Sequence, residues 1–310
     1  MDNQDIKVTI RCITYNQKDY IRQCLDGFVI QRTNFRFEAI VHDDASTDGT
    51  AEIVREYAEK YPDIIKPIFE TENQYSKHDG SLGRIMNANT RGKYVAICEG
   101  DDYWTDPLKL QKQADFLDAN PQCSLTYHAC KNVFSTPCKV NCLTGENVKD
   151  FYSDVDFVIH YPFQTATVMY RKDILDSDLY KKAQAIGCVF GDVLLYFSAS
   201  RFGTIEGVNE KMSVYRRHEG GISQHMYDAD KLWKSYNDWL KVALLFGGKI
   251  SSFIKKERLS ALIVKAYSYK KYFLFLRLEA LSLIKSPISF VQSLKTILRF
   301  NYNRFFKKKL

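Results

Sequence analysis

The chain has 310 residues, 45% of them hydrophobic and 14% aromatic, so it can bury a sizeable core and is not expected to be disordered. No run of eighteen apolar residues and no basic-then-apolar leader occurs, so we expect neither a membrane-spanning helix nor a signal peptide. The net charge of +7 is uneven, because residues 249–310 carry 15 Lys or Arg against two Glu, a net of +13, whereas the other 248 residues sum to −6.

Strands and helices are predicted to alternate over the first hundred residues. Short stretches rich in β-branched residues are typical of strands, namely 7–13, 37–44, 64–69 and 93–98. Apolar residues at helical spacing lie between them, at 17–31 with Asn16 as the expected N-cap, at 46–61 before Pro62, and at 81–91. This alternation predicts βαβ units and a mainly parallel sheet, with the third strand near an edge because it contains Pro67.

Two of the predicted strands end in pairs of aspartates, Asp43-Asp44 and Asp101-Asp102. In sheets of this kind ligands bind beyond the carboxyl ends of the strands, so both pairs should face one crevice. Clustered carboxylates are costly unless a cation joins them, which favours a divalent metal site. A helix cap or a solvated turn is the structural alternative for each pair.

Several common sites are missing from the sequence. Neither G-x-G-x-x-G after the first strand nor G-x-x-x-x-G-K-[ST] occurs, which argues against a dinucleotide enzyme and a P-loop NTPase. The eight cysteines lack zinc-site spacing, so reduced thiols are expected. A nucleotide site without a glycine cradle needs another way to neutralise a diphosphate, and a carboxylate-bound cation provides one.

Three ordered motifs resemble the family 2 inverting glycosyltransferases, which have the GT-A fold. The motifs are "CITYNQKDYIRQCLDGFVIQ", "EAIVHDDASTDGT" and "EGDDYWTDPLKLQKQADFL", and the match covers roughly residues 6–125. It weakens over 126–225, where "QTATVMYR", "FGDVLLY" and "MSVYRRHEGGIS" are also similar to family landmarks. The fold class that the resemblance implies is α/β, with a mainly parallel central sheet, followed here by a basic α-helical C-terminal region.

The resemblance implies roles for the N-terminal motifs. Tyr15 would lie against the nucleobase of a sugar nucleotide, and Asp44 would accept a hydrogen bond from that base. Asp101 would hold the ribose, and Asp102 would ligate a Mn²⁺ or Mg²⁺ ion that bridges the diphosphate. Many relatives have Asp where this chain has Glu99, which is therefore an expected donor contact with a longer side chain.

Inversion at the anomeric carbon is a single in-line displacement, so a carboxylate must take the proton of the attacking acceptor hydroxyl. In the family this base lies about ninety positions after the metal motif, at the start of a helix. Asp192 in "VFGDVLLYF" matches that place. An N-cap aspartate is the structural alternative, and one aspartate can serve as both.

Residues later in the chain complete the expected site. Arg216 and Arg217 precede two glycines and would cover the phosphates, since cationic donors suit a phosphate-covering loop. Related enzymes often use a late His as a metal ligand, which points to His218. Trp104 and Gln164 are expected on the acceptor side, although a core tryptophan is an equal alternative for Trp104.

The basic tail contains two predicted amphipathic helices separated by Pro287. Phe and Tyr alternate with Lys and Arg, which is typical of a helix pair that lies on an anionic membrane. The alternatives are a helical bundle packed on the catalytic domain, and nucleic-acid binding, which no known motif supports.

These patterns predict a metal-dependent glycosyltransferase that moves a hexose or N-acetylhexosamine from a UDP-sugar to a glycan or polyprenyl-linked acceptor, in bacterial surface polysaccharide synthesis. The expected domains are 1–225, with nucleotide-binding (1–125) and acceptor-binding (126–225) halves, and a helical region at 226–310. The expected location is cytoplasmic, at the inner face of the membrane, without nucleic acid. Two alternatives stay open, a sugar-phosphate nucleotidyltransferase and an inactive GT-A-like binding module. The first normally needs a glycine-rich N-terminal loop, which residues 11–20 lack.

Overall fold

The structure is a computed structural model that describes residues 5–134, 163–187, 191–218, 221 and 229–268, and short stretches between 275 and 295. The chain divides into two compact units. One comprises residues 1–187 and 191–219, and the other comprises 188–190 and 220–310.

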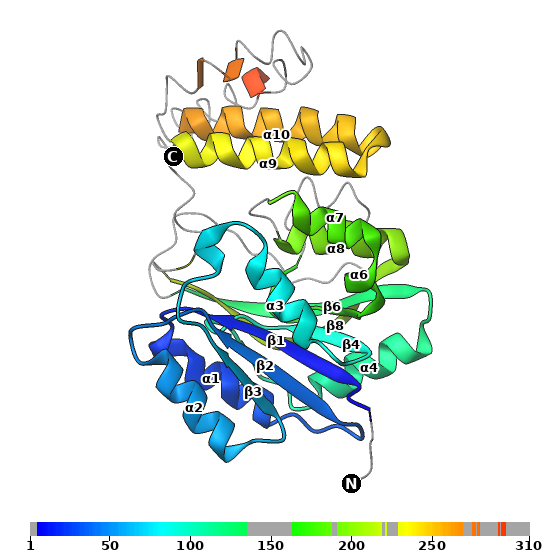
Figure 1. The fold of residues 1–310 in the computed structure, drawn as a ribbon. Helices are drawn as coiled ribbons and strands as arrows, with labels where there is room; N and C mark the ends of the chain where they lie inside the picture. Colours follow the sequence, from blue (N-terminus) through cyan, green and yellow to red (C-terminus); the bar gives the residue numbers. More distant parts are fainter. Residues whose placement is uncertain are drawn as a thin grey trace, which may run out of the picture. The chain divides into compact units, whose positions relative to one another are not determined.

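The first unit begins with the predicted alternation of strands and helices (Figure 1). Its elements run in the order β1 (Val8–Thr14), α1 (Lys18–Val29), β2 (Phe37–Asp43), α2 (Thr50–Lys60), β3 (Ile65–Phe69), η1 (Tyr75–Lys77), α3 (Ser81–Asn89) and β4 (Tyr94–Ile97). The four predicted strands and three predicted helices are confirmed, with ends within a few residues of those expected.

The rest of this unit completes the sheet. Its elements are β5 (Tyr103–Trp104), α4 (Lys109–Ala119), β6 (Cys123–Phe134), η2 (Thr165–Thr167), β7 (Met169–Arg171), α6 (Asp173–Asp176), α7 (Asp178–Ala185), α8 (Gly191–Phe202) and β8 (Thr204–Arg217). The strand order is β3-β2-β1-β4-β7-β6-β8-β5 in one eight-stranded sheet. Strands β1 to β4 are parallel, whereas β7 runs antiparallel to both β4 and β6. As predicted, Pro67 lies on an edge strand, β3.

Helices cover both faces of this sheet, as the side chains of β6 show. Successive residues of a strand point to opposite faces. The buried ring of Tyr127 contributes to one face, where Phe163 stacks between it and Tyr196 of α8. The neighbouring residue Thr126 lies next to α4, whose Gln113 donates from Nε2 to the carbonyl of Thr167 at 2.9 Å. Helices α4 and α8 therefore lie on opposite faces of the sheet.

The second unit contains a helical hairpin, α9 (Ala229–Phe246) and α10 (Gly248–Ser268). Gly247 and Gly248 join the helices with φ of 62° and 59°, a left-handed backbone that favours glycine. Tyr236 of α9 packs in a buried apolar cluster with Leu259 and Ile263 of α10. Within the described part of the chain, no helix has the length and apolar content needed to cross a membrane. The predicted helix break at Pro287 lies outside the described residues.

Candidate active site

The acidic segments that follow β2 and β4 meet at the carboxyl end of β1. The N–H of Asp44 donates to the carbonyl of Thr14 at 2.9 Å, and the N–H of Gly100 donates to the carbonyl of Ile13 at 3.0 Å. A Cβ atom at Gly100 would lie 2.7 Å from Thr14 Oγ1, so only glycine allows this close approach. The two acidic segments therefore flank the end of the same strand, as predicted.

The loop after β1 and the loop after β2 are joined by hydrogen bonds. The N–H of Asn16 donates to Ser46 Oγ at 2.9 Å, and the N–H of Thr47 donates back to Asn16 Oδ1 at 2.9 Å. The N–H of Lys18 donates to Asp48 Oδ2 at 3.0 Å. This pairing fixes the backbone of both loops before any ligand binds.

Strained backbone marks the same place. Asn16 and Ala45 have φ of 51° and 65°, which is uncommon for residues with a side chain and is concentrated at functional sites. Because Asn16 takes this conformation, α1 begins one residue later than expected, with Gln17 as its N-cap. Tyr15 precedes this turn and is 48% exposed, so its ring is available to a ligand.

The carboxylate of Asp44 already has two backbone partners. It is 1% exposed and accepts N–H hydrogen bonds from Gln74 at 2.7 Å and from Tyr75 at 3.0 Å, which fixes the start of η1. Its neighbour Asp43 belongs to the same aspartate pair, which was expected to face the crevice. Oδ2 of Asp43 accepts from the N–H of Ser46 at 3.1 Å, while its buried Oδ1 has no hydrogen-bond partner. The unpaired oxygen makes Asp43 a further candidate polar contact at this edge.

The turn after β4 concentrates negative charge. Burial raises the pKa of Asp102 well above its usual range, and the charges of Asp101 and Glu99 raise it further. Burial also raises the pKa of Glu99 to about 7, against a hydrogen bond from Thr165 Oγ1 at 2.5 Å that lowers it. The raised values follow from burial and from mutual repulsion, which both disfavour the charged forms.

The end of β8 and the residue after it bring basic side chains to this turn. The N–H of Arg216 donates to Asp102 Oδ1 at 2.8 Å, and its guanidinium donates from Nη1 to the carbonyl of Asp101 at 2.6 Å. His218 Nε2 lies 3.0 Å from Asp101 Oδ2, and its ring packs against Tyr20 with centroids 4.6 Å apart. Arg216 and His218 are thus brought to the acidic turn.

Arg217 points elsewhere on the strand. Its guanidinium lies over the rings of Phe134 and Tyr215, 5.8 and 5.6 Å from the ring centroids. Alternation along a strand explains the difference, since neighbours project to opposite faces. The structure therefore pairs only the first of the two predicted arginines with the acidic turn.

Asp192 is the second residue of α8, and its Oδ1 accepts a hydrogen bond from the N–H of Val193 at 2.8 Å. Burial raises the pKa of Asp192 to about 6. Its charge contributes to the raised pKa of Glu99 and of Tyr75, so the three groups share one electrostatic environment. The structure thus brings the predicted base close to the acidic turn, although 90 residues separate Asp192 from Asp102.

The two acceptor-side predictions have different outcomes. Trp104 is 2% exposed, packs on Phe28 and donates its indole N–H to the carbonyl of Ala166 at 2.8 Å. The prediction that it contacts the acceptor is therefore wrong, because Trp104 is a core residue. Gln164 is 4% exposed, but the next residue, Thr165, reaches Glu99. Thr165 was expected beside Gln164 in the acceptor-lining region, and its hydroxyl donates to the Glu99 carboxylate.

The donor set is chemically suited to a hard divalent cation. Asp102 and His218 offer carboxylate and imidazole ligands, and the raised pKa of Asp102 marks charge that a cation would offset. Within the described residues, no group of three or more His, Cys, Asp or Glu side chains is arranged to hold a metal. The residues fit the predicted ion in chemistry, and their arrangement here is not yet that of a metal site.

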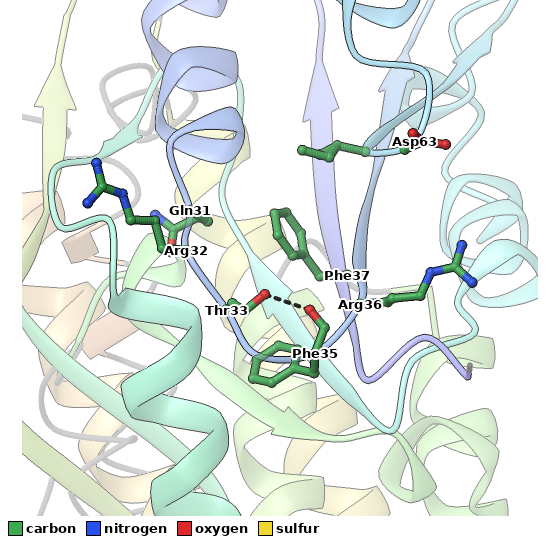
Figure 2. A pocket seen from close by; sticks show the side chains of 8 residues that line it. Gln31, Arg32, Thr33, Phe35, Arg36, Phe37 and Asp63 are labelled. Carbon is green, nitrogen blue, oxygen red and sulfur yellow. Dashed lines mark hydrogen bonds between the residues drawn. The ribbon is translucent and has the colours of Figure 1, made fainter. Parts of the chain in front are cut away.

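A pocket of about 570 Å³ lies at the amino ends of β2 and β3, away from the acidic turn (Figure 2). It is lined by residues that precede β2 and β3, including Arg32, Arg36 and Asp63. The two guanidinium groups point away from each other in Figure 2, so no set of polar groups converges there. This pocket lacks the chemistry of the acidic edge.

Comparison with known proteins assigns the family. The family model described as "Glycosyl transferase family 2" matches residues 9–177, which contain the paired loops and the acidic turn. The chain belongs to glycosyl transferase family 2. The resemblance stated from the three motifs is confirmed, and so is the α/β GT-A fold.

Curated relatives share part of their length with this family 2 chain. An uncharacterized Mycobacterium tuberculosis protein is 38% identical over 230 residues, which cover 74% of this chain and 64% of that protein. A candidate teichuronic acid biosynthesis glycosyltransferase of Bacillus subtilis, TuaG, is 33% identical over 38% of this chain and 44% of its own. The chain thus spans less than two thirds of these relatives.

Solved structures show the same fold. Residues 1–349 of Staphylococcus aureus TarS, in complex with UDP-GlcNAc, align with a TM-score of 0.61 at 19% identity, covering 85% of this chain and 73% of that one. The Pyrobaculum calidifontis mannosyltransferase PcManGT, in complex with GDP-Man and Mn²⁺, aligns with a TM-score of 0.55 at 18% identity, covering 98% and 88%.

Proposed function

We propose that this family 2 chain is an inverting glycosyltransferase that moves a hexose or N-acetylhexosamine from a nucleoside diphosphate sugar, with UDP as the first candidate, to a glycan or lipid-linked acceptor. One observation carries the proposal. Asp192, whose pKa is raised to about 6, shares its electrostatic environment with the acidic turn at the end of β4. A base beside a cation-binding turn is what a single displacement on a sugar diphosphate requires.

The proposed donor site follows the acidic edge. Tyr15 and the Asp44 turn border the nucleoside, Asp101 and Glu99 contact the ribose and the sugar, and Arg216 faces the diphosphate. Arg217 would join the phosphates only if the end of β8 rearranged. A Mn²⁺ or Mg²⁺ ion bound by Asp102 and His218 would neutralise charge on the leaving diphosphate.

In the proposed step, an acceptor hydroxyl attacks the anomeric carbon from the face opposite the diphosphate. The new C–O bond forms as the bond to the diphosphate oxygen breaks, and the hydroxyl proton passes to a carboxylate oxygen of Asp192. The N–H of Val193 helps to fix the position of this side chain, because it donates to Oδ1 and leaves Oδ2 for the proton.

Relatives and structural neighbours support the donor class without deciding it. TarS was solved with UDP-GlcNAc and PcManGT with GDP-Man and Mn²⁺, so both nucleotides should be tested. The name of TuaG favours a surface polysaccharide as the product. For the setting, we propose the inner face of an anionic membrane, on the strength of the tail with a net charge of +13.

A panel of UDP- and GDP-sugars, incubated with Mn²⁺ and with EDTA, tests the proposal by measuring the nucleoside diphosphate released. We expect metal-dependent release of the nucleoside diphosphate, either by transfer of the sugar to an acceptor or by slow transfer to water. Formation of pyrophosphate from a nucleoside triphosphate and a sugar phosphate would instead identify a nucleotidyltransferase. Absence of both activities, together with absence of nucleotide binding, would favour an inactive binding module.

A further inference from the structure

The turn between α9 and α10 carries exposed apolar side chains. The two helices run side by side and are joined at one end (Figure 1). Leu244, in the last turn of α9, is 74% exposed, the highest value for a large apolar side chain among the described residues. Leu245 and Phe246 after it, and Ile250 in the first turn of α10, are partly exposed. Neighbouring apolar side chains left in solvent often mark a contact surface.

The backbone of this turn is well defined. The N–H of Gly247 donates to the carbonyl of Ala243 at 3.1 Å, and the N–H of Ser251 donates to the carbonyl of Gly247 at 3.0 Å. The helices on either side pack together through the buried cluster that contains Tyr236. Leu244 is therefore presented by a packed helical hairpin and not by a frayed helix end.

Positive charge surrounds the apolar turn. Residues 240–256 contain four lysines and no Asp or Glu. Each helix has an exposed lysine close to the turn, Lys241 on α9 and Lys255 on α10. The nearest acidic residues in the sequence, Asp238 and Glu257, are each paired with a lysine, with distances from Nζ to the carboxylate oxygen of 3.1 and 3.7 Å. The turn thus combines exposed apolar surface with a positive surround.

This combination fits a lipid surface better than a second copy of the chain. Two such turns would bring lysines of the same sign together, which opposes self-association. An anionic bilayer offers negative headgroups above an apolar interior, and lysine can leave its ammonium among the headgroups while its stem lies on apolar surface. Neither α9 nor α10, over its described length, is suited to cross a membrane, so the contact would be shallow.

We propose that the α9–α10 turn inserts Leu244 and its apolar neighbours at the boundary between headgroups and acyl chains of an anionic phospholipid bilayer, with Lys241 and Lys255 among the headgroups. The inference rests on the membrane setting of the proposed function, which was argued from the charge of the tail alone. The turn adds an apolar contact, which salt does not screen, to the attraction of the tail, which salt screens.

Flotation of the full chain with vesicles of phosphatidylglycerol and phosphatidylcholine in equal amounts tests the turn. Leu244→Gln should weaken vesicle binding about 10-fold, because an apolar side chain that enters the bilayer is replaced by a polar one. Since Leu244 is exposed, this variant should unfold at the wild-type temperature. Leu108→Gln is the matched control, because Leu108 is an exposed leucine of the first unit, before α4, and should leave vesicle binding unchanged.

A fluorescent side chain at the turn reports insertion directly. On these vesicles, the added tryptophan of Leu244→Trp should emit at shorter wavelength and be quenched by brominated acyl chains. Lys234→Trp should show neither effect, because Lys234 is exposed on α9 about 15 Å along the helix from Leu244. At about 1 M salt, where the Debye length is about 3 Å, Leu244→Gln should still weaken the remaining binding by the same factor.

The outcomes separate this inference from the proposed function. Either unchanged vesicle binding of Leu244→Gln or an unquenched tryptophan in Leu244→Trp would overturn the inserted turn and leave the electrostatic contact of the tail standing. If the wild type does not bind the vesicles, the membrane setting and the inserted turn are both wrong, whereas release of the nucleoside diphosphate tests the transferase by itself. A change of self-association in Leu244→Gln, measured by sedimentation without lipid and with vesicle binding unchanged, would identify a contact between copies instead.

Discussion

The N–H of Arg216 donates to Asp102 Oδ1 at 2.8 Å, across 114 residues of sequence. This hydrogen bond joins the end of β8 to the acidic turn after β4, and the Arg216 side chain reinforces it by donating to the carbonyl of Asp101. Without a metal, the protein's own hydrogen-bond donors thus partly compensate the negative charge of the turn. A bound cation would add to this compensation, so the turn should be more stable with its ligand than alone.

Asp102→Asn should therefore separate stability from binding. The amide oxygen can still accept the N–H of Arg216, but the titratable carboxyl group, whose pKa is raised by burial and by Asp101, is gone. We expect an unfolding temperature a few degrees higher at pH 7 and loss of Mn²⁺-dependent UDP binding by at least about 10-fold. Thermal unfolding and calorimetry measure the two effects. Tight Mn²⁺-dependent binding in the variant would remove Asp102 as a metal ligand.

Asp192→Asn should retain donor binding and lose transfer. An amide can keep the hydrogen bond from the N–H of Val193 but cannot take a proton, so kcat should fall about 10²–10⁴-fold with little change in the Kd for UDP. Asp178→Asn is a matched control, because Asp178 is exposed in the first turn of the neighbouring helix α7. Unchanged turnover in Asp192→Asn would exclude it as the base.

The pH profile of kcat/KM should carry the same signature, because this parameter reports the pKa of groups in the free enzyme. Burial raises the pKa of Asp192 to about 6, and only the ionised carboxylate acts as a base. Activity should therefore be full above that value and should fall about 10-fold for each pH unit below it. The residual rate of Asp192→Asn should lack this acidic limb. If activity of the variant still falls below about pH 6, the decrease comes from the titration of another group.

Lys109 allows a prediction about stability. It is fully buried over the ring of Trp104, its Nζ has no hydrogen-bond partner, and burial lowers its pKa to about 7. The unfolded chain keeps the ordinary, higher value, so the penalty is greatest below pH 7 and fades as pH rises through the range between the two values. Lys109→Met should raise the free energy of unfolding by on the order of 2 kcal/mol at pH 7, and less at pH 10.

Urea unfolding at the two pH values measures this difference. Lys60→Met is the matched control, because Lys60 is exposed at the end of α2 and its removal should change stability little at either pH. If Lys109→Met is less stable than the wild type at pH 7, the buried ammonium makes contacts worth more than its desolvation.

The proposed membrane contact is tested on the tail. Each basic residue near an anionic surface contributes about 1 kcal/mol, so neutralising Arg304, Lys307, Lys308 and Lys309 to Gln should weaken binding to phosphatidylserine vesicles at least about 100-fold. UDP binding should not change. A cut after Lys249 is a poorer test, since it removes α10, on which Tyr236 packs. Unaltered vesicle binding in the neutralised variant would reject the electrostatic contact.

Local sequence signals were sufficient to predict the first half of the sheet, β1 to β4. Strand and helix periodicity predicted β1 to β4, and Pro67 predicted that β3 is an edge strand. The two aspartate pairs predicted that negative charge gathers at the carboxyl ends of the strands. These features depend only on residues that are close together in the sequence. The contact between the loops after β1 and β2 is also local in origin, because the two loops follow adjacent parallel strands.

Long-range contacts could not be predicted in this way. Trp104 faces the core because its indole N–H donates to the carbonyl of Ala166, 62 residues later in the chain. The different directions of Arg216 and Arg217 depend on the register of β8. The attachment of η1 to the carboxylate of Asp44 is a further contact that no spacing in the sequence reveals.

The outer strand β3 is protected against extension of the eight-stranded sheet. Pro67 has no N–H to offer another strand in the middle of β3. A second copy of the chain could therefore not form an unbroken ladder of hydrogen bonds along β3, and this margin of the sheet should resist fibril-like stacking even at high concentration.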